Sequence, residues 1–410
     1  MNARISSEME KSTESQKMGE RETRLNKRRP HLCLIYAGGT IGMIRKRRGD
    51  EEVLVPPKIN SKEQFFRHLR AEHEASEIAD VDFVALTPKD STNMVPSDWT
   101  CMANAINKRL KNGYDGFVIA HGTDTLHFSA SALAFAFGTN LNVPIVLTGA
   151  QATPDVPHGD ARVNLLRAMK VASHENLAEV VVAFGDFVFR GCRAQKKDER
   201  RFDAFEAPAE FPLGYITEEI IISDRARRRK ANAKEVEFHP NFCNGIVQIS
   251  LIPGLEPDLL YPILEKNSAI NGIVLQSFGA GNVPNEDAGK RFNFQAFIRR
   301  AVEQDIPVIV ASQFPANSTL ASYYAPGRDA VRAGAIPTGN MTNAAATVKF
   351  RWVLHQVNEQ IRTGVLRKSE KLKRVSSMMN TPYVEELTLL AEELTVLKKR
   401  ENRRGGTNHN

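Results

Sequence analysis

The sequence has few cysteines, no long apolar run and no apolar stretch near its start. The four cysteines (Cys33, Cys101, Cys192 and Cys243) are scattered and include no C-x-x-C pair, so neither a disulfide framework nor a zinc site is indicated. No run of 18 apolar residues occurs, and the first thirty residues are polar and charged, which argues against a membrane-spanning helix and a secretory signal. We therefore expect a cytoplasmic protein with reduced thiols, no metal and no membrane contact.

The middle of the chain also lacks an excess of positive charge. The net charge is +7, but residues 1–30 and 366–410 account for all of it, and the interval between them is balanced. A nucleic-acid-binding protein is expected to carry a basic excess on its folded body, so nucleic acid is not an expected partner. We interpret the two local basic clusters, at 45–48 and 225–230, as solvated loops.

Strand-like and helical stretches alternate along most of the chain, which predicts a mainly parallel sheet with helices on both faces. A length of 410 residues favours two domains. We expect an α/β fold with two α/β domains: a larger N-terminal domain with a mostly parallel sheet and flanking helices, and a smaller C-terminal α/β domain. The expected strands are 31–37, 81–87, 117–120, 143–148, 179–184, 246–250, 272–275 and 307–310, and helical spacing occurs at 97–111 and 162–174.

A change of composition at 224–244, where the chain is polar, basic and poor in periodicity, indicates the domain boundary. The expected division is a disordered charged leader at 1–30, an N-terminal domain at 31–230, a linker at 231–244, a C-terminal domain at 245–365 and a basic, partly helical tail at 366–410. Within this tail, 381–400 has leucines at helical spacing and glutamates before its basic residues, as the helix dipole favours. We expect one helix there.

Two Gly-Thr turns follow predicted strands, at the place where open α/β sheets bind ligands. The first, AGGTIG, has neither the lysine of a P-loop nor the glycine spacing of a dinucleotide-binding turn. Thr40 in this turn is a candidate nucleophile, and the alternative is a helix N-cap. The second turn, HGTDT, offers Thr123 and Asp124, which also serve commonly as helix caps.

Together, AGGTIG and HGTDT resemble the two signatures of the bacterial-type L-asparaginase family. The resemblance covers roughly residues 31–360 and is closest to the cytoplasmic type I branch, which also carries YxGGTIGM and FRGxRxxK. Further similar stretches are DSTNM (90–94), LTGAQ (147–151), NLLRAM (164–169), FRGCRAQK (189–196), FDAF (202–205), SFGAGNVP (277–284) and YAPG (324–327).

The resemblance implies hydrolysis of L-asparagine to L-aspartate and ammonia, without a metal or cofactor, and L-glutamine as a minor substrate. It maps the nucleophile onto Thr40 and a supporting group onto Thr123, Asp124 and Lys196. A lysine ammonium beside a hydroxyl lowers the pKa of that hydroxyl or, if desolvated, accepts its proton. Without the resemblance, Lys196 would read as a surface lysine in a charged loop.

The resemblance also implies how the substrate is held. Ser91 maps to the serine that binds the α-carboxylate, with Thr92 beside it, and Asp124 pairs with the α-ammonium group. The backbone N–H groups that follow Gly39 and Gly122 are candidate donors to an oxyanion.

One departure from the family concerns the tyrosine that relays the proton of the nucleophile. Many members carry it about a dozen residues after the first threonine, where this chain has Leu54. Some type I relatives use a tyrosine in a Y-A-x-G stretch instead, which maps here to Tyr324. The alternative for the pair is that Tyr324 and Tyr323 only pack against each other.

Family members form homodimers that pair into homotetramers, so the resemblance implies a homo-oligomer. Two other functions stay open. One is the ammonia-supplying subunit of a tRNA-dependent amidotransferase, although the 30-residue leader is shorter than the extra N-terminal domain of such subunits. The other is an amino-acid-binding regulator without turnover, which the leucine at position 54 suggests.

Overall fold

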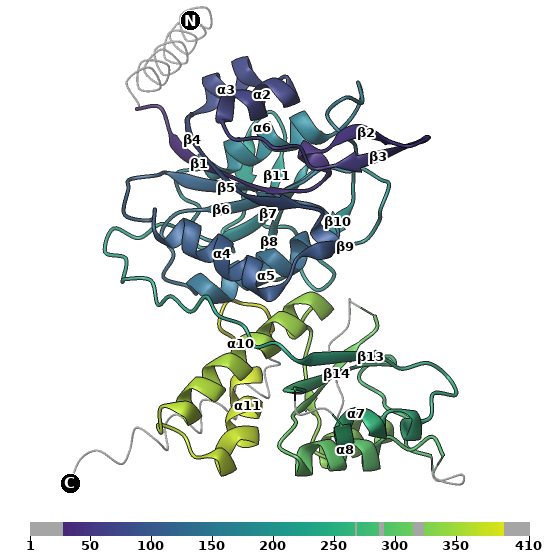
Figure 1. Ribbon diagram of the computed structural model, residues 1–410. Coiled ribbons are helices and arrows are strands. Elements are labelled where there is room, and N and C mark those ends of the chain that lie inside the picture. The colour runs from purple at the N-terminus through teal and green to yellow at the C-terminus, as the bar shows by residue number, and fades with distance from the viewer. Residues whose placement is uncertain (1–27, 267–268, 287–290, 315–323, 389–410) are drawn as a thin grey trace, which may run out of the picture.

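The computed structural model describes residues 28–266, 269–286, 291–314 and 324–388, which form a larger and a smaller α/β unit (Figure 1). The larger unit holds an eight-stranded sheet in the order β12-β11-β8-β7-β6-β5-β1-β4. The smaller unit holds a four-stranded sheet in the order β13-β14-β15-β16. The predicted fold class, with a larger N-terminal and a smaller C-terminal unit, is therefore confirmed.

Five strands of the larger sheet run parallel, and three antiparallel strands extend it at one edge. The parallel strands are β7 (Val180–Phe184), β6 (Ile145–Thr148), β5 (Gly116–Ala120), β1 (His31–Gly38) and β4 (Asp80–Lys89), and the antiparallel ones are β8 (Phe187–Arg190), β11 (Gly214–Ile216) and β12 (Ile220–Ile222). Parallel strands covered on both faces are apolar along their whole length. The buried runs of β5 and β7 show this pattern, and the five predicted strands of this unit are confirmed.

Helices cover both faces of the larger sheet (Figure 1). On one face lie α2 (Lys62–Leu69), α3 (Glu72–Ile78) and α6 (Ala161–Ala172), and on the other lie α4 (Pro96–Asn107) and α5 (Leu126–Phe137). Successive side chains of β1 alternate between two buried clusters, because neighbouring residues of a strand point to opposite faces. Leu34 packs with the first helix group and Ile35 with the second.

The smaller sheet is entirely parallel. Its strands are β13 (Ile246–Ser250), β14 (Gly272–Ser277), β15 (Val308–Ser312) and β16 (Ile336–Pro337), and the helices of this unit are α7 (Tyr261–Lys266), α8 (Gln295–Glu303), α9 (Ala325–Arg332), α10 (Asn343–Arg362) and α11 (Lys371–Met379). The long helix α10 packs against α5, and one buried cluster spans both units. Trp352 of α10 stacks on Phe135 of α5 at a ring-centroid distance of 5.8 Å.

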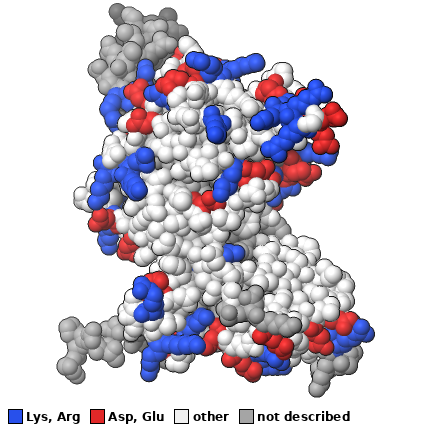
Figure 2. Space-filling view, viewed as in Figure 1, with Lys and Arg blue, Asp and Glu red and all other residues white. Residues whose placement is uncertain are grey.

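The interpretation of the two basic clusters as solvated loops is correct only in part: residues 45–48 are exposed but form a strand, and residues 225–230 form a loop in which Arg227 and Arg229 are partly buried. Residues 45–48 belong to β2 (Ile44–Arg48), which pairs with β3 (Glu51–Val55) in an exposed hairpin where arginines face glutamates. In the second cluster, the guanidinium of Arg227 lies 3.4 Å from the buried carboxylate of Glu179, and Arg229 donates to the carbonyl of Asp115. Figure 2 shows basic and acidic side chains interspersed over the larger unit on the face drawn.

The prediction of a helix at 381–400 is wrong over 381–388, and 389–400 lies outside the described residues. Glu385 has a φ of 64°, a left-handed conformation that a helix of L-residues does not contain. The side chain of Glu386 turns back and accepts hydrogen bonds from the backbone N–H groups of Tyr383 and Val384. Across the described ranges, no helix is long and apolar enough to cross a membrane.

Candidate active site

Four neighbouring strands of the larger sheet end at one edge, and a turn after each contributes to a single pocket. These strands are β4, β1, β5 and β6, whose carboxyl ends meet because they are parallel. The pocket has a volume of about 200 Å³ and is lined by Gly39, Thr40, Met43, Asp90, Ser91, Gly122, Thr123, Asp124, Gln151, Lys196 and Glu199. Five of the sequence-predicted site residues are therefore in one place: Thr40, Ser91, Thr123, Asp124 and Lys196.

Glycine is required in the first turn because two backbone segments touch there. Gly38 and Gly39 have positive φ values of 114° and 84°, which L side chains rarely adopt. A Cβ atom on Gly39 would overlap the backbone of Gly122, and one on Gly122 would lie 2.6 Å from Oγ of Ser91. The glycines thus bring Thr40, Ser91 and the second turn together.

Lys196 links the second turn to the antiparallel end of the unit. It lies on the short strand β9 (Gln195–Lys196), which pairs with β10 (Phe205–Glu206). Its Nζ donates to Oγ1 of Thr123 at 2.8 Å and to Oδ1 of Asp124 at 2.6 Å. The lysine side chain is only 13% exposed, whereas that of Asp124 is 52% exposed. Lys196 is therefore a largely buried cation held by the site, not a surface lysine.

Neither Thr40 nor Thr123 is a helix cap, although the second turn does supply the cap of the next helix from another of its residues. Thr40 is the first residue of the short helix η1 (Thr40–Gly42), whose N-cap is Gly39. The helix after the second turn, α5, has Thr125 as its N-cap. The hydroxyl of Thr123 instead donates to Oε1 of Gln151 at 3.0 Å, which leaves its lone pairs to accept from Lys196.

The structure places the other predicted residues as follows. Thr92 lies in the short helix η2 (Ser91–Asn93), outside the pocket lining, and its hydroxyl donates to Oδ1 of Asp90 at 2.9 Å. Tyr324 is the N-cap of α9 and is 51% exposed. Leu54 lies on the exposed hairpin, and Tyr323 falls outside the described residues. No tyrosine is among the described residues that line the pocket.

Gln151 belongs to the site although the sequence did not single it out. Besides accepting from Thr123, it donates from Nε2 to the carbonyl of Asp198 at 3.1 Å. Its backbone N–H donates to the buried carboxylate of Asp160, which also accepts from Asn164. Burial raises the pKa of Asp160. The position of LTGAQ directly after a predicted strand was the sequence signal for this residue.

A buried histidine supports the second turn from behind. Nδ1 of His121 lies 2.7 Å from the carbonyl oxygen of Gly122, and Nε2 lies 2.9 Å from Oγ of Ser129. Burial lowers the pKa of His121 to about 4, so the ring is neutral at pH 7. Nδ1 then donates to the carbonyl, and Nε2 accepts from the serine. His121 acts on the backbone and does not line the pocket.

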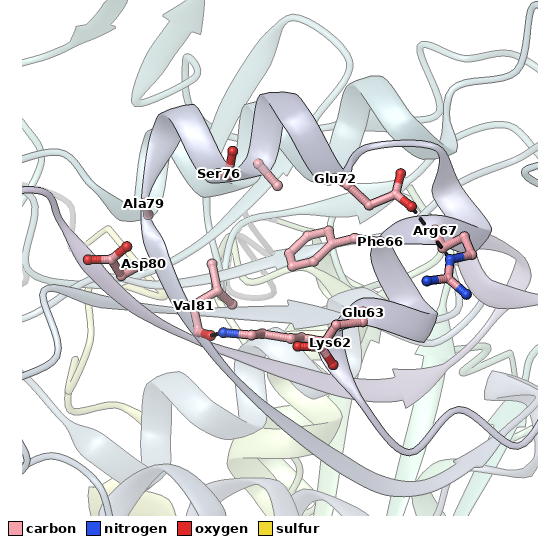
Figure 3. Close-up of a pocket in the computed structure, with 10 residues that line it drawn as sticks. Lys62, Glu63, Phe66, Arg67, Glu72, Ser76, Ala79, Asp80 and Val81 are labelled. Carbon is pink, nitrogen blue, oxygen red and sulfur yellow. Dashed lines mark hydrogen bonds and ion pairs between the residues drawn. The ribbon is translucent and has the colours of Figure 1, made fainter.

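A larger cavity of about 330 Å³ lies between α2, α3 and the start of β4 (Figure 3). Three of its charged side chains have partners within it: Nζ of Lys62 donates to the carbonyl of Val81, and Arg67 lies 3.9 Å from Glu72. Ser76, which contributes a hydroxyl, donates it to the carbonyl of His73. This cavity therefore offers no activated nucleophile. In the described part of the chain, no group of three or more His, Cys, Asp or Glu side chains is placed to hold a metal ion.

Comparison with known proteins identifies two family domains and relatives of two kinds. Residues 31–228 match the family model "Asparaginase, N-terminal", and residues 246–363 match "Glutaminase/Asparaginase C-terminal domain". The chain is 34% identical to a glutamyl-tRNA(Gln) amidotransferase subunit of Aeropyrum pernix over 80% of this chain and 75% of that relative. It is 32% identical to L-asparaginase 1 of Escherichia coli over 82% of this chain and 95% of that relative. The crystal structure of L-asparaginase I from Vibrio cholerae superposes with a TM-score of 0.72 at 29% identity, over 88% of this chain and all of that one.

Proposed function

The chain belongs to the asparaginase family, and we propose that it is an L-asparaginase that converts L-asparagine to L-aspartate and ammonia. The observation that carries the proposal is the pocket that Thr40 lines together with the bonded group of Lys196, Thr123 and Asp124. A volume of about 200 Å³ is below the roughly 300–1,000 Å³ of sites for drug-sized ligands. It suits one small amino acid.

The proposed reaction begins with attack of Oγ1 of Thr40 on the side-chain amide carbon of asparagine. The C–N bond breaks, ammonia leaves with one added proton, and an acyl ester on Thr40 remains until water hydrolyses it. The backbone N–H groups of Thr40 and Thr123, which follow the two touching glycines, are the proposed donors to the oxyanion. The Thr40 proton passes through the predicted relay tyrosine, Tyr324, and the Lys196 ammonium, which donates to the hydroxyl of Thr123, favours proton transfer to the departing amide nitrogen.

Substrate selection rests on charge. Asparagine carries an α-ammonium and an α-carboxylate group. Lys196 contacts the Oδ1 atom of the half-exposed Asp124 carboxylate. The other carboxylate oxygen, Oδ2, is the proposed acceptor for the ammonium group of the substrate. Ser91 lines the same pocket and provides a hydroxyl for the α-carboxylate. L-Glutamine, longer by one methylene, is the expected minor substrate, because one methylene changes selectivity by roughly 10- to 200-fold.

Ammonia release from L-asparagine and L-glutamine by the purified protein tests this proposal. Thr40→Ala is expected to lower kcat for asparagine by at least about a thousandfold, because it removes the nucleophile. The exposed Thr217, whose hydroxyl bonds the carbonyl of Glu219, gives the matched control Thr217→Ala, which should keep full activity. Equal kcat in the two variants would show that Thr40 is not the nucleophile.

The ammonia-supplying subunit of an amidotransferase is a second candidate function, which the similarity to the Aeropyrum pernix protein favours. Such a subunit would release ammonia from asparagine or glutamine efficiently only when a partner chain and charged tRNA are present. Purification from the native cells followed by mass spectrometry distinguishes the two functions. A stoichiometric partner chain would support the amidotransferase, and a homo-oligomer with full activity alone would support the asparaginase.

A regulator that binds asparagine without hydrolysing it is the third candidate. It is favoured by one observation: Leu54, at the position where many family members carry the tyrosine, lies on the exposed hairpin, and no tyrosine is among the described residues that line the pocket. An increase in melting temperature with L-asparagine but no ammonia release would support this function.

A cytoplasmic homodimer or homotetramer completes the asparaginase proposal, and light scattering of the purified protein measures the size of the assembly.

A further inference from the structure

The C-terminal segment 383–388 packs on the turn that leads to Lys196. This turn, 191–194, joins β8 to β9. Nε of Arg193 donates to the carbonyl of Glu385 at 2.8 Å, and its Nη2 donates to Oγ1 of Thr388 at 3.1 Å. Sγ of Cys192 donates to the carbonyl of Val384 at 3.3 Å. Two consecutive residues of the turn are thus bonded to a segment about 190 positions later in the chain.

An ionic network in which Arg190 and Glu179 are buried and Glu385 is half-exposed holds the start of the same turn. Arg190, the last residue of β8, lies 2.7 Å from both Glu179 and Glu385, and its side chain is 3% exposed. Arg227 approaches the same two carboxylates at 3.4 Å and 3.7 Å. Charges removed from water are stable only when they are paired and bonded in this way. The network therefore fixes Glu385 relative to the end of β8.

The segment itself is fixed to α10. Lys349 of α10 and Glu386 are both fully buried and lie 2.6 Å apart. Nζ of Lys349 also donates to the carbonyls of Met379 and Thr381. The left-handed conformation at Glu385 directs its carbonyl group to Arg193. The side chain of the next residue, Glu386, pairs with Lys349. Because α10 belongs to the smaller unit, this segment ties that unit to the turn before Lys196.

Lys196 needs such support because its own strand makes few backbone hydrogen bonds to hold it in place. The strands β9 and β10 pair over two residues each, in a ribbon separate from the eight-stranded sheet. Three positions separate Arg193 from Lys196, which spans at most roughly 10 Å of chain. A shift of the turn therefore moves the ammonium away from Thr123 and Asp124.

We propose that Arg193 is a positioning residue: by bonding the C-terminal segment 383–388, it sets the place of the Lys196 ammonium in the active site. The catalytic part of this inference rests on the proposed function, whereas the placement of Lys196 does not. Arg193 is 2% exposed and does not line the pocket, so it acts through Lys196 and not on the substrate.

The test compares Arg193→Ala and Arg193→Lys with a change at another arginine that also donates to a backbone carbonyl of a distant segment. Arg351 of α10 donates to the carbonyl of Cys243 at 2.9 Å, and Arg351→Ala is the control. Three quantities are measured: kcat and KM for L-asparagine, the melting temperature, and the rate at which an amine-acylating reagent modifies Lys196, followed by peptide mass spectrometry.

For Arg193→Ala, we expect kcat to fall about 10- to 100-fold with little change in KM, since small displacements of a catalytic group have effects of this size. Modification of Lys196 should become about tenfold faster, as expected when charge-assisted hydrogen bonds are lost. Arg193→Lys keeps one charged donor, so its kcat and its rate of Lys196 modification should lie between those of wild type and Arg193→Ala. Arg351→Ala should lower the melting temperature and leave kcat and the modification rate unchanged.

A lower melting temperature of Arg193→Ala with unchanged kcat and unchanged Lys196 modification would overturn the inference and leave the proposed function intact. If the wild type releases no ammonia, the proposed function fails and the modification rate alone decides the inference. If Arg193→Ala does not fold, Thr388→Ala removes one of the same bonds. It should speed Lys196 modification in the same direction by a smaller factor, and an unchanged rate there would overturn the inference.

Discussion

Gly39 lies against Gly122 so closely that a Cβ atom on the first would overlap the Cα and N atoms of the second. The two Gly-Thr turns are therefore in backbone contact, and the distance between Thr40 and Thr123 depends on that contact. Gly39→Ala should destabilise the protein by more than about 2 kcal/mol, because overlap with backbone cannot be relieved by a rotamer change. Urea unfolding and ammonia release measure both consequences.

Gly49 provides the control for backbone strain without overlap. It also has a positive φ, of 62°, but nothing lies within 4 Å of a Cβ atom built on it. Gly49→Ala should cost about 1 kcal/mol, the strain of a left-handed alanine, and keep full activity. Similar losses of stability and activity in the two variants would mean that the contact between the turns is unimportant.

Asp124 is expected to recognise the α-ammonium group of the substrate, and an analogue isolates this contact. Succinamic acid has the amide and carboxylate groups of asparagine but no ammonium. Wild type should prefer asparagine over this analogue by at least about tenfold in kcat/KM, since a charge-assisted hydrogen bond contributes about 1.5–3 kcal/mol. In Asp124→Asn this preference should largely disappear. A preference that survives the substitution would place the ammonium elsewhere.

Tyr324 remains the predicted proton acceptor for Thr40. In that role its hydroxyl group would take the proton that Thr40 loses when it attacks the substrate. Tyr324→Phe removes that hydroxyl and keeps the ring, so kcat should fall about 10²- to 10⁴-fold, the usual contribution of general base catalysis. Tyr215, 45% exposed on β11, gives the control Tyr215→Phe. Unchanged kcat in Tyr324→Phe would remove this tyrosine from the mechanism and leave Lys196 and Thr123 to accept the proton.

The sequence predicted the parts of the molecule that local pattern determines. Apolar runs located the strands, and Gly-Thr after two of them predicted turns that line one pocket, because parallel strands bring their carboxyl ends to one edge. The conformation of 383–388 depends instead on Lys349, which lies more than thirty residues earlier. Leucine spacing alone favours a helix there, and a buried ion pair between distant residues overrides it. Arg227 was misjudged for the same reason, because its partner, Glu179, is distant in the sequence.

A partly buried histidine should make the protein acid-sensitive. Burial lowers the pKa of His127 from 6.5 to about 4, so between these values the unfolded chain binds the proton that the folded one excludes, and stability falls as pH falls. From pH 7 to pH 5 this one residue should remove about 2 kcal/mol. His127→Phe suits a site beside Phe128 and Phe205. Over the same pH interval, the free energy of unfolding of this variant should fall by about 2 kcal/mol less than that of wild type. Urea unfolding at both pH values measures the difference, with exposed His73 replaced by Asn as the control. Equal losses in His127→Phe and wild type would show that His127 is charged in the folded protein.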